Sequence, residues 1–389
     1  MNNLFSLKIR KEWFFIIGIS ISFNVMLTNY LFEFDSGAVN GGDSLRFILK
    51  IISIFLIMIS QPFPNKLIIK KNLLLILSFF FFLFSYIIFF PFSTWNDFQF
   101  LNMFFVIFLL FGIGYNHSFL VKLNKILIYI FLFIWLPTDL YAIFSGNNLW
   151  ENKAFIGGIG NPSSYGMIMI YLILMNKGFF NPIIEILINF LLFFSLFLTQ
   201  ALMPILIMFV LSFFLFKKRH ILFFLIIFTF LFYTYFNYIL ESLGLQDIHW
   251  FLKLQALTEY GFSSSNNSGS VFYRLEYFKD IYKLFDNPFV FLFGHVNSVS
   301  YNGGDSQYIS YLTSFGFPMF LFFIFSMFKI IYDIKFFVTF RLKLFFSAFF
   351  LILITNRYLD YWPNAIIVFF IINYIGDSIN TKSFLRIKS

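Results

Sequence analysis

Long apolar runs, separated by short polar segments, constrain the fold of this chain more than any other feature of its sequence. Of its 389 residues, 60% are hydrophobic and only 12% are charged. An ordinary soluble domain carries about 25% charged residues. A domain in water must also present a wettable exterior, which this composition does not supply. The sequence therefore predicts an α-helical integral membrane protein whose outer surface contacts lipid.

The apolar runs predict about twelve transmembrane helices, because one span needs about 20 apolar residues. Their approximate limits are 13–32, 46–62, 72–91, 99–116, 126–145, 164–177, 182–199, 201–216, 220–239, 314–330, 343–356 and 364–376. The first run is better explained as a span than as a cleavable signal, and 182–216 fits either two spans or one broken hairpin. We therefore expect an all-α polytopic fold in three parts: transmembrane helices 1–9 in 1–239, a large, partly helical extracytoplasmic loop in 240–313, and transmembrane helices 10–12 with a cytoplasmic tail in 314–389.

Basic residues between the apolar runs predict the orientation in the membrane. With the N-terminus inside, nearly every compact basic cluster falls on the cytoplasmic side, as the positive-inside rule requires. These clusters are Lys8, Arg10 and Lys11; Lys66, Lys70 and Lys71; Lys122 and Lys125; Lys217, Lys218 and Arg219; Lys329, Lys335, Arg341 and Lys343; and Lys382, Arg386 and Lys388. Both termini are thus predicted to be cytoplasmic. The net charge of +9 indicates this orientation rather than binding to nucleic acid.

The predicted outer loop 240–313 carries most of the residues suited to chemistry. Segments 241–257 and 271–287 are expected to be helical, on either side of the flexible sequence GFSSSNNSGS. Arg274 lies off the apolar face of the second helix, where its guanidinium could bind a phosphate or diphosphate. Taken alone, the charge pattern around Arg274 fits an ordinary solvated helix face better.

Two further residues of the same loop are candidates for a functional site. His295 follows Gly294, and histidine is the natural base near neutral pH, although a lone histidine is usually a surface residue. Asp305 follows a glycine pair, which permits an unusual backbone and the close approach of a ligand. It also precedes an apolar run, where it fits a turn and the N-cap of the following span. Both roles can hold together.

A second predicted outer loop, FIGGIGNPSSYG at 155–166, ends in Asn161-Pro162 at the start of a span. It lacks the GK[ST] sequence and the preceding strand of a nucleotide-binding loop. Ionisable residues also fall within predicted spans, where they are functional candidates by default: Lys50, Asp139 and Glu185. Asp139 is the one we expect at an outward-facing site. The chain has no Cys, which excludes disulfides and thiol chemistry.

Three stretches resemble bacterial O-antigen and capsular polysaccharide polymerases of the Wzy type, which are related to O-antigen ligases. They are AFIGGIGNPSSYGMIMIYLI at 154–173, FLTQALMPILIMFV at 197–210, and the segments 273–295 and 303–323. The chain departs from the family pattern in several places. Gln200-Ala201 stands where the family has Ser-Arg, Ser163 replaces the second Asn of Gly-Asn-Pro-Asn, His295 replaces the second Gly of Gly-x-Gly, and Asp305 stands where relatives often have His.

This resemblance implies glycosyl transfer on the outer face of the cell inner membrane. The donor would be a growing glycan on undecaprenyl diphosphate, and the acceptor a single lipid-linked repeat unit. The resemblance implies Arg274 as the group that neutralises the leaving diphosphate, Arg357 and Lys153 as further cations, Asp305 or His295 as the base, Tyr308 and Asn161 as ligands of sugar hydroxyls, and Asp139 as part of the outward-facing site. It requires no metal or cofactor, and it implies a flippase and a chain-length regulator as partners.

Other functions remain open at the level of sequence. A lipid-linked oligosaccharide flippase would have a similar length and number of spans, but such transporters usually show a repeat between their halves, which this chain does not. An O-antigen ligase would use the same donor and differ only in its acceptor, so the sequence does not separate it from a polymerase. A non-enzymatic membrane scaffold has no motif in its favour.

Overall fold

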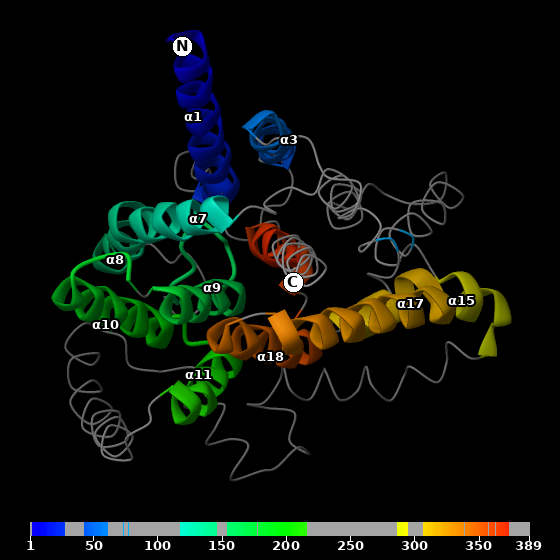
Figure 1. Cartoon of the computed structure of the whole chain (residues 1–389). Coiled ribbons are helices and arrows are strands. Elements are labelled where there is room, and N and C mark those ends of the chain that lie inside the picture. The colour runs from blue at the N-terminus through cyan, green and yellow to red at the C-terminus, as the bar shows by residue number, and fades with distance from the viewer. Residues whose placement is uncertain are drawn as a thin grey trace, which may run out of the picture.

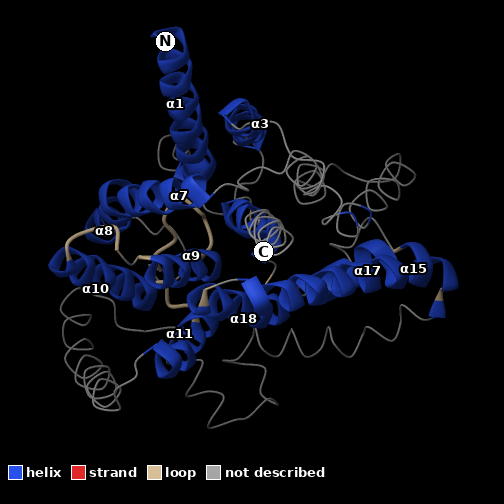
Figure 2. Cartoon of the chain, viewed as in Figure 1, coloured by secondary structure: helices blue, strands red, loops and turns tan. Residues whose placement is uncertain are grey.

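The computed structural model describes the chain in separate ranges: 2–27, 43–60, 73, 77, 117–145, 154–176, 178–215, 286–294, 306–337, 339–356, 358–361 and 363–372. Figures 1 and 2 show that all regular structure in these ranges is helical, with no strand. The all-α prediction is therefore confirmed for the described residues. The predicted spans 99–116 and 220–239, the helix expected at 241–257 and nearly all of the one at 271–287 lie outside them.

Helix length gives the first measure of membrane character. Within the described ranges, one helical stretch, Leu120–Ser145, is long and apolar enough to cross a membrane. Shorter apolar helices are Ile48–Ser60, Pro162–Met175, Pro182–Leu198, Leu202–Ser212, Gly316–Lys329 and Pro363–Ile372. The structure thus shows one full-length candidate span, and the count of twelve stays a prediction.

The helix α9 (Pro162–Met175) lies at the centre of the fold. Its side chains are buried almost throughout. Around it pack α7 (His117–Ile130), α10 (Pro182–Leu198), α11 (Leu202–Leu215) and α18 (Phe340–Thr355) (Figure 1). A helix enclosed on all sides needs no polar face, which explains why its sequence is a continuous apolar run.

Two contacts set an antiparallel register between α9 and α18. At the end of α9, Arg341 Nη1 donates to the carbonyl of Leu174 over 2.9 Å. About one turn further along, the rings of Tyr171 and Phe345 lie 5.1 Å apart. Continued in the same register, the start of α9 is level with the end of α18. The loop before α9 and the turn after α18 therefore lie at the same end of the bundle.

The helix α1 (Asn2–Asn24) likewise has its predicted inner and outer ends beside those of a neighbouring helix. It packs closely on α3 (Asp43–Ser60) at Gly18 and runs beside the stretch from α7 to α8 (Leu136–Ser145). Glu12 pairs with Lys122 at 2.6 Å near one end. At the other end, Trp135 Nε1 donates to Asn24 Oδ1 over 2.9 Å.

The contacts therefore sort the predicted inner and outer helix ends to opposite ends of the bundle. At the predicted inner end, Glu185 in the first turn of α10 accepts from the amides of Phe179 and Phe180. At the predicted outer end, the amide of Phe155 donates to Leu198 across 2.9 Å. Residues 199–201 separate α10 from α11, so two helices cover 182–215, as expected both for two spans and for one broken hairpin.

A widened turn interrupts the long stretch between α7 and α8. Residues Phe131–Trp135 form a π-helical turn, in which the amide of Leu136 bonds to the carbonyl of Phe131. Pro137 explains this turn, because proline has no N–H and its ring would clash with the carbonyl four residues earlier. Trp135 and Asp139, on either side of the proline, are both completely buried.

The helix α17 (Gln307–Phe337) folds back on itself at Gly316, whose φ of 79° and ψ of 168° are not helical. The rings of Tyr311 and Phe323 are 4.7 Å apart, whereas a continuous helix would hold these two residues about 18 Å apart. The element is therefore two antiparallel arms, 307–315 and 317–337. The predicted span 314–330 crosses this reversal, so the long arm begins at 317 instead.

The short helix α15 (Pro288–Phe293) packs on the reversal in α17, at the end of α17 away from α18 (Figure 1). A side chain at Gly316 would collide with the backbone of Leu292 and Phe293. The rings of Phe291 and Phe317 stack 5.0 Å apart at the same place. Close backbone approach and a positive φ together require glycine at 316.

Candidate functional site

Only some of the predicted site residues lie within the described part of the chain. Asp139, Asn161 and Tyr308 are described. The remaining candidates, Arg274, His295, Asp305, Arg357 and Lys153, lie outside the described residues. The candidate site is therefore built from the first group and from the described neighbours of the second.

Asp139 lies inside the protein, where its carboxylate holds a loop. Both of its oxygens accept from the amide of Gly157 at 3.1 Å, and Oδ1 also accepts from Ile156 at 3.4 Å. The side chain has no exposed surface. In the described structure Asp139 thus fixes the loop before α9 and does not point toward an outer surface.

That loop, residues 154–161, is largely buried although it was predicted as an outer loop. Gly157 has a φ of 52°, and a side chain at Gly158 would come within 2.6 Å of Trp135 Nε1. Glycine therefore allows the loop to pack between the end of α1 and the start of α8. Buried loops require partners for their backbone groups, and Asp139 and Leu198 supply several of them.

Asn161 is the N-cap of α9. Its Oδ1 accepts from the amide of Ser164 at 3.0 Å, and Pro162 occupies the first helical position. This is the expected role of Asn before a Pro-initiated helix. The cap uses only one lone pair of Oδ1, so it does not by itself prevent Asn161 from binding a sugar hydroxyl.

Ser306 is the N-cap of α17, a role for which the sequence had suggested Asp305. Its hydroxyl oxygen accepts from the amide of Ile309 at 3.5 Å. The same hydroxyl donates to the carbonyl of Leu353 over 3.4 Å, one of the carbonyls in the last turn of α18 that lack a helical partner. The role of cap is therefore filled without Asp305.

The next two side chains also reach α18 and the turn after it. Gln307 Oε1 accepts from the amide of Leu359 at 2.9 Å, fully buried and across 52 positions of sequence. The hydroxyl of Tyr308, which is half-buried, donates to the carbonyl of Phe350 over 3.4 Å. Together with Ser306, these bonds fasten the start of α17 to the end of α18.

The described neighbours of Asp305 and Arg357 are consequently held together. Asp305 directly precedes Ser306 in the sequence, and Arg357 lies between Asn356 and Tyr358. Ala154, which follows Lys153, belongs to the buried loop at the same end of the bundle. Gly294, which precedes His295, ends α15 with a φ of 76° beside the reversal of α17.

Sequence reasoning missed a group of buried polar side chains at this end. Ser164 Oγ, the Tyr358 hydroxyl and both polar atoms of Asn364 have no hydrogen-bond partner, and all three residues are completely buried. Each such atom costs about 1–3 kcal/mol in a folded protein. Burial raises the pKa of the Tyr358 hydroxyl well above its ordinary value, so it remains a protonated donor at physiological pH. The only signal in the sequence was Asn364, a polar residue at the start of an apolar run.

The described residues contain no group of three or more His, Asp and Glu side chains that could hold a metal ion. What they offer instead is a set of hydroxyl, carboxamide and backbone groups, suited to binding a polar, uncharged ligand. Charge at this end would come from the predicted cations outside the described ranges.

No protein-family model matches the chain, and neither the curated proteins nor the solved structures include a significant match to it. The functional proposal therefore depends on the residues and the geometry given above.

Proposed function

We propose that the chain is a polytopic protein of the cell inner membrane, with about twelve spans and both termini in the cytoplasm. Its exposed apolar side chains support this. Ile183 and Ile186 on α10 are 76% and 70% exposed, and Phe133 is 74% exposed. Large apolar side chains exposed in this way are unfavourable in water and favourable against lipid.

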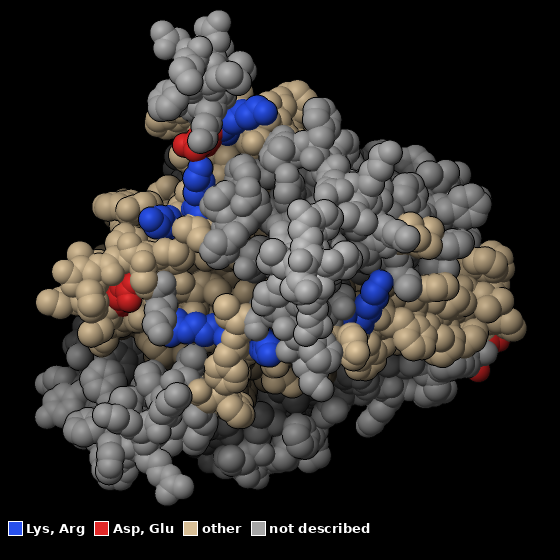
Figure 3. All heavy atoms as spheres, viewed as in Figure 1, with Lys and Arg blue, Asp and Glu red and all other residues tan. Residues whose placement is uncertain are grey.

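The distribution of charge is also consistent with a membrane protein. On the face drawn in Figure 3, the described Lys and Arg side chains lie singly or in small groups over α1, α7 and the α17–α18 region, separated by uncharged surface. Binding to nucleic acid would favour a continuous basic surface. The spacing instead fits short basic segments between spans.

Within this membrane setting, the reaction we propose is the polymerisation of undecaprenyl-diphosphate-linked repeat units into O-antigen or capsular polysaccharide. One observation carries the proposal: described parts of all three stretches that resemble Wzy-type polymerases lie at the end of the bundle that we predict to be the outer one. Phe155 bonds to Leu198, which joins the first stretch to the second. The helix start at Gln307, from the third, bonds to the turn after α18, which is level with the start of α9.

The chemistry follows from a substitution at the anomeric carbon. An acceptor hydroxyl oxygen bonds to that carbon, the bond to the lipid diphosphate breaks, and the hydroxyl proton passes to Asp305 or His295. The departing diphosphate carries negative charge, which Arg274 and Arg357 neutralise. The hydrogen bond from the Leu359 amide to the Gln307 side chain holds the residues that follow Asp305 close to those that follow Arg357.

Deletion of the gene tests this function. A polymerase deletion leaves a surface glycan that carries a single repeat unit, and Arg274→Ala reproduces that glycan. Lys279→Ala, a change of the same charge in the same segment, is the control and keeps long chains. Repeat units trapped on the cytoplasmic face after deletion would show a flippase instead. Polymer that is made but never attached would show a ligase.

A further inference from the structure

Ser164, Tyr358 and Asn364 come from three separate parts of the fold but lie at one end of it. Ser164 is in the first turn of α9. Tyr358 is in the turn Tyr358–Asp360, which follows α18. Asn364 is in the first turn of the helix Pro363–Ile372. The antiparallel register of α9 and α18 brings the first two to the same level.

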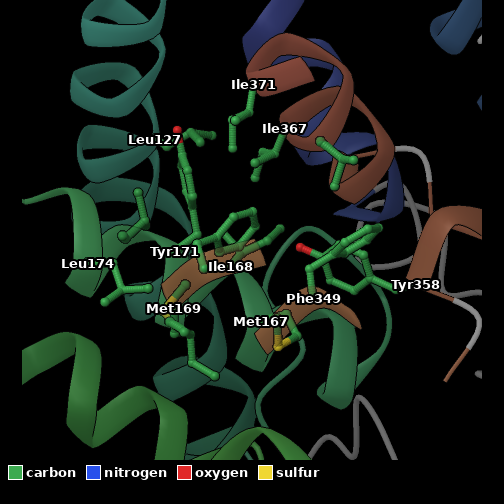
Figure 4. Packing of buried hydrophobic residues seen from close by; sticks show 14 of the residues in the cluster. Leu127, Met167, Ile168, Met169, Tyr171, Leu174, Phe349, Tyr358, Ile367 and Ile371 are labelled. Carbon is green, nitrogen blue, oxygen red and sulfur yellow. The ribbon is translucent and has the colours of Figure 1, made fainter. Parts of the chain in front are cut away.

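The side chains also face a common interior. Figure 4 shows the Tyr358 ring beside Phe349, with its hydroxyl directed into the packed cluster around α9. The ring centroids of Tyr358 and Phe349 lie 5.5 Å apart. The same figure places Ile168, Ile367 and Ile371 on the facing surfaces of this cluster.

Helical spacing places the other two polar groups on those surfaces. Ser164 precedes Ile168 by one turn of α9, and Asn364 lies on the same face of its helix as Ile367 and Ile371. Both are completely buried. None of their side-chain polar atoms has a partner, so packing alone gives no reason for polar residues at these positions.

We propose that Ser164, Tyr358 and Asn364 form a subsite that binds the hydroxyl groups of a sugar unit in the lipid-linked glycan. This inference depends on the proposed function and names which part of the substrate this end of the bundle recognises. The side chains are enclosed in the described structure. A sugar can therefore reach them only if this end of the bundle opens.

The chemistry of the side chains favours sugar hydroxyls over phosphate. The Asn364 carboxamide presents a donor and an acceptor together, and each hydroxyl can act as either. A sugar hydroxyl likewise donates and accepts, so it satisfies all of them. The diphosphate diester of the lipid carrier has no O–H and only accepts, so it would leave Asn364 Oδ1 unsatisfied. Water has the same donor and acceptor character as a sugar hydroxyl, so the experiment must separate the two.

Binding of the free repeat-unit oligosaccharide to the purified full-length protein in detergent tests the subsite. The oligosaccharide is released by mild acid from the lipid fraction of the deletion strain. We expect Tyr358→Phe and Asn364→Leu each to weaken binding about tenfold, while the melting temperature stays unchanged or rises because an unsatisfied buried group has been removed. Ser164→Ala should act in the same direction.

Tyr171→Phe is the matched control. It also removes a tyrosine hydroxyl from the buried core, but the Tyr171 hydroxyl, unlike that of Tyr358, donates a hydrogen bond to Asn124. It should therefore lower the melting temperature and leave oligosaccharide binding unchanged. A purely structural role for Tyr358 would give this same pattern in Tyr358→Phe.

Equal oligosaccharide binding by the wild type, Tyr358→Phe and Asn364→Leu would overturn the subsite. The polar groups of Ser164, Tyr358 and Asn364 would then be partners of ordered water only. That outcome holds whichever glycan the deletion strain makes. Weakened binding together with normal glycan length after gene deletion would keep the sugar subsite and reject the polymerase. The two proposals therefore fail separately.

Discussion

At the scale of single residues, Asp139 shows how an ionisable group within an apolar segment can serve architecture. A charged residue in a predicted span is a functional candidate by default. The Asp139 carboxylate instead accepts hydrogen bonds from the amides of Ile156 and Gly157. Its position near the predicted outer end followed from the sequence. Its partners did not, because they depend on how a loop 17–18 positions away folds back.

Replacement of Asp139 should loosen the loop 154–161. Asp139→Ala leaves buried amides without an acceptor, and we expect it to lower the free energy of unfolding by about 2–4 kcal/mol. Asp139→Asn keeps one acceptor oxygen and should lose less. Thermal unfolding of the detergent-purified protein measures both. Equal stability of Asp139→Ala and wild type would show that the carboxylate does not hold the loop.

At the scale of secondary-structure elements, the helical character of the described residues was predicted correctly, whereas the reversal at Gly316 was not. The Asn-Pro pair correctly marked the start of α9, because capping is a local interaction. The fold-back at Gly316 was missed, since hydropathy is continuous through it and the deciding contact, Tyr311 with Phe323, forms only in three dimensions. The boundary predicted at 314 was displaced for this reason.

Gly316→Ala should disrupt this reversal. The positive φ of 79° disfavours a side chain, and the methyl group would meet the backbone of α15. We expect a loss of about 2 kcal/mol or more in stability, seen as a lower melting temperature and faster proteolysis. Gly178→Ala is the control, because Gly178 also has a positive φ but open space around it. A similar loss in both variants would assign the effect to φ alone.

The bond between Gln307 and Leu359 joins elements distant in sequence, and its removal should affect activity. Gln307→Leu has a similar volume but leaves the Leu359 amide unpaired. We expect it to shorten the surface glycan, because the segments beside Asp305 and Arg357 are no longer fastened together. Gln307→Glu retains the acceptor oxygen and should preserve longer chains. Membrane levels of the protein, measured by immunoblot, separate this effect from loss of folding.

At the scale of the whole molecule, composition and charge predicted a helical protein with alternating ends; the described residues confirm the helical character, and the alternation stays a prediction. Composition and charge did not predict which helices pack against each other. The pairing of α9 with α18 depends on Arg341 and Leu174, 167 positions apart. The buried polar group of Ser164, Tyr358 and Asn364 was likewise hidden, since burial follows from packing rather than from residue type.

The absence of native cysteines makes the orientation directly testable. Single-cysteine variants Ser264→Cys in the predicted outer loop and Ser389→Cys at the C-terminus carry no background thiol. A membrane-impermeant maleimide should label Ser264→Cys in spheroplasts and Ser389→Cys only after permeabilisation. The reverse pattern would invert the proposed topology and would place the candidate site on the cytoplasmic side.

The unequal lengths of two apolar helices have a consequence for the lipid of the proposed membrane. With 17 residues, α10 is about 26 Å long, and it presents exposed isoleucines on its outer side. The stretch Leu120–Ser145 has 26 residues and is about 39 Å long, while a typical hydrocarbon layer measures about 30 Å. In the proposed membrane, the protein would have an apolar belt of uneven height, and acyl chains beside α10 would have to compress or disorder to match it. Reconstitution in lipids of increasing acyl length should therefore strain this side first.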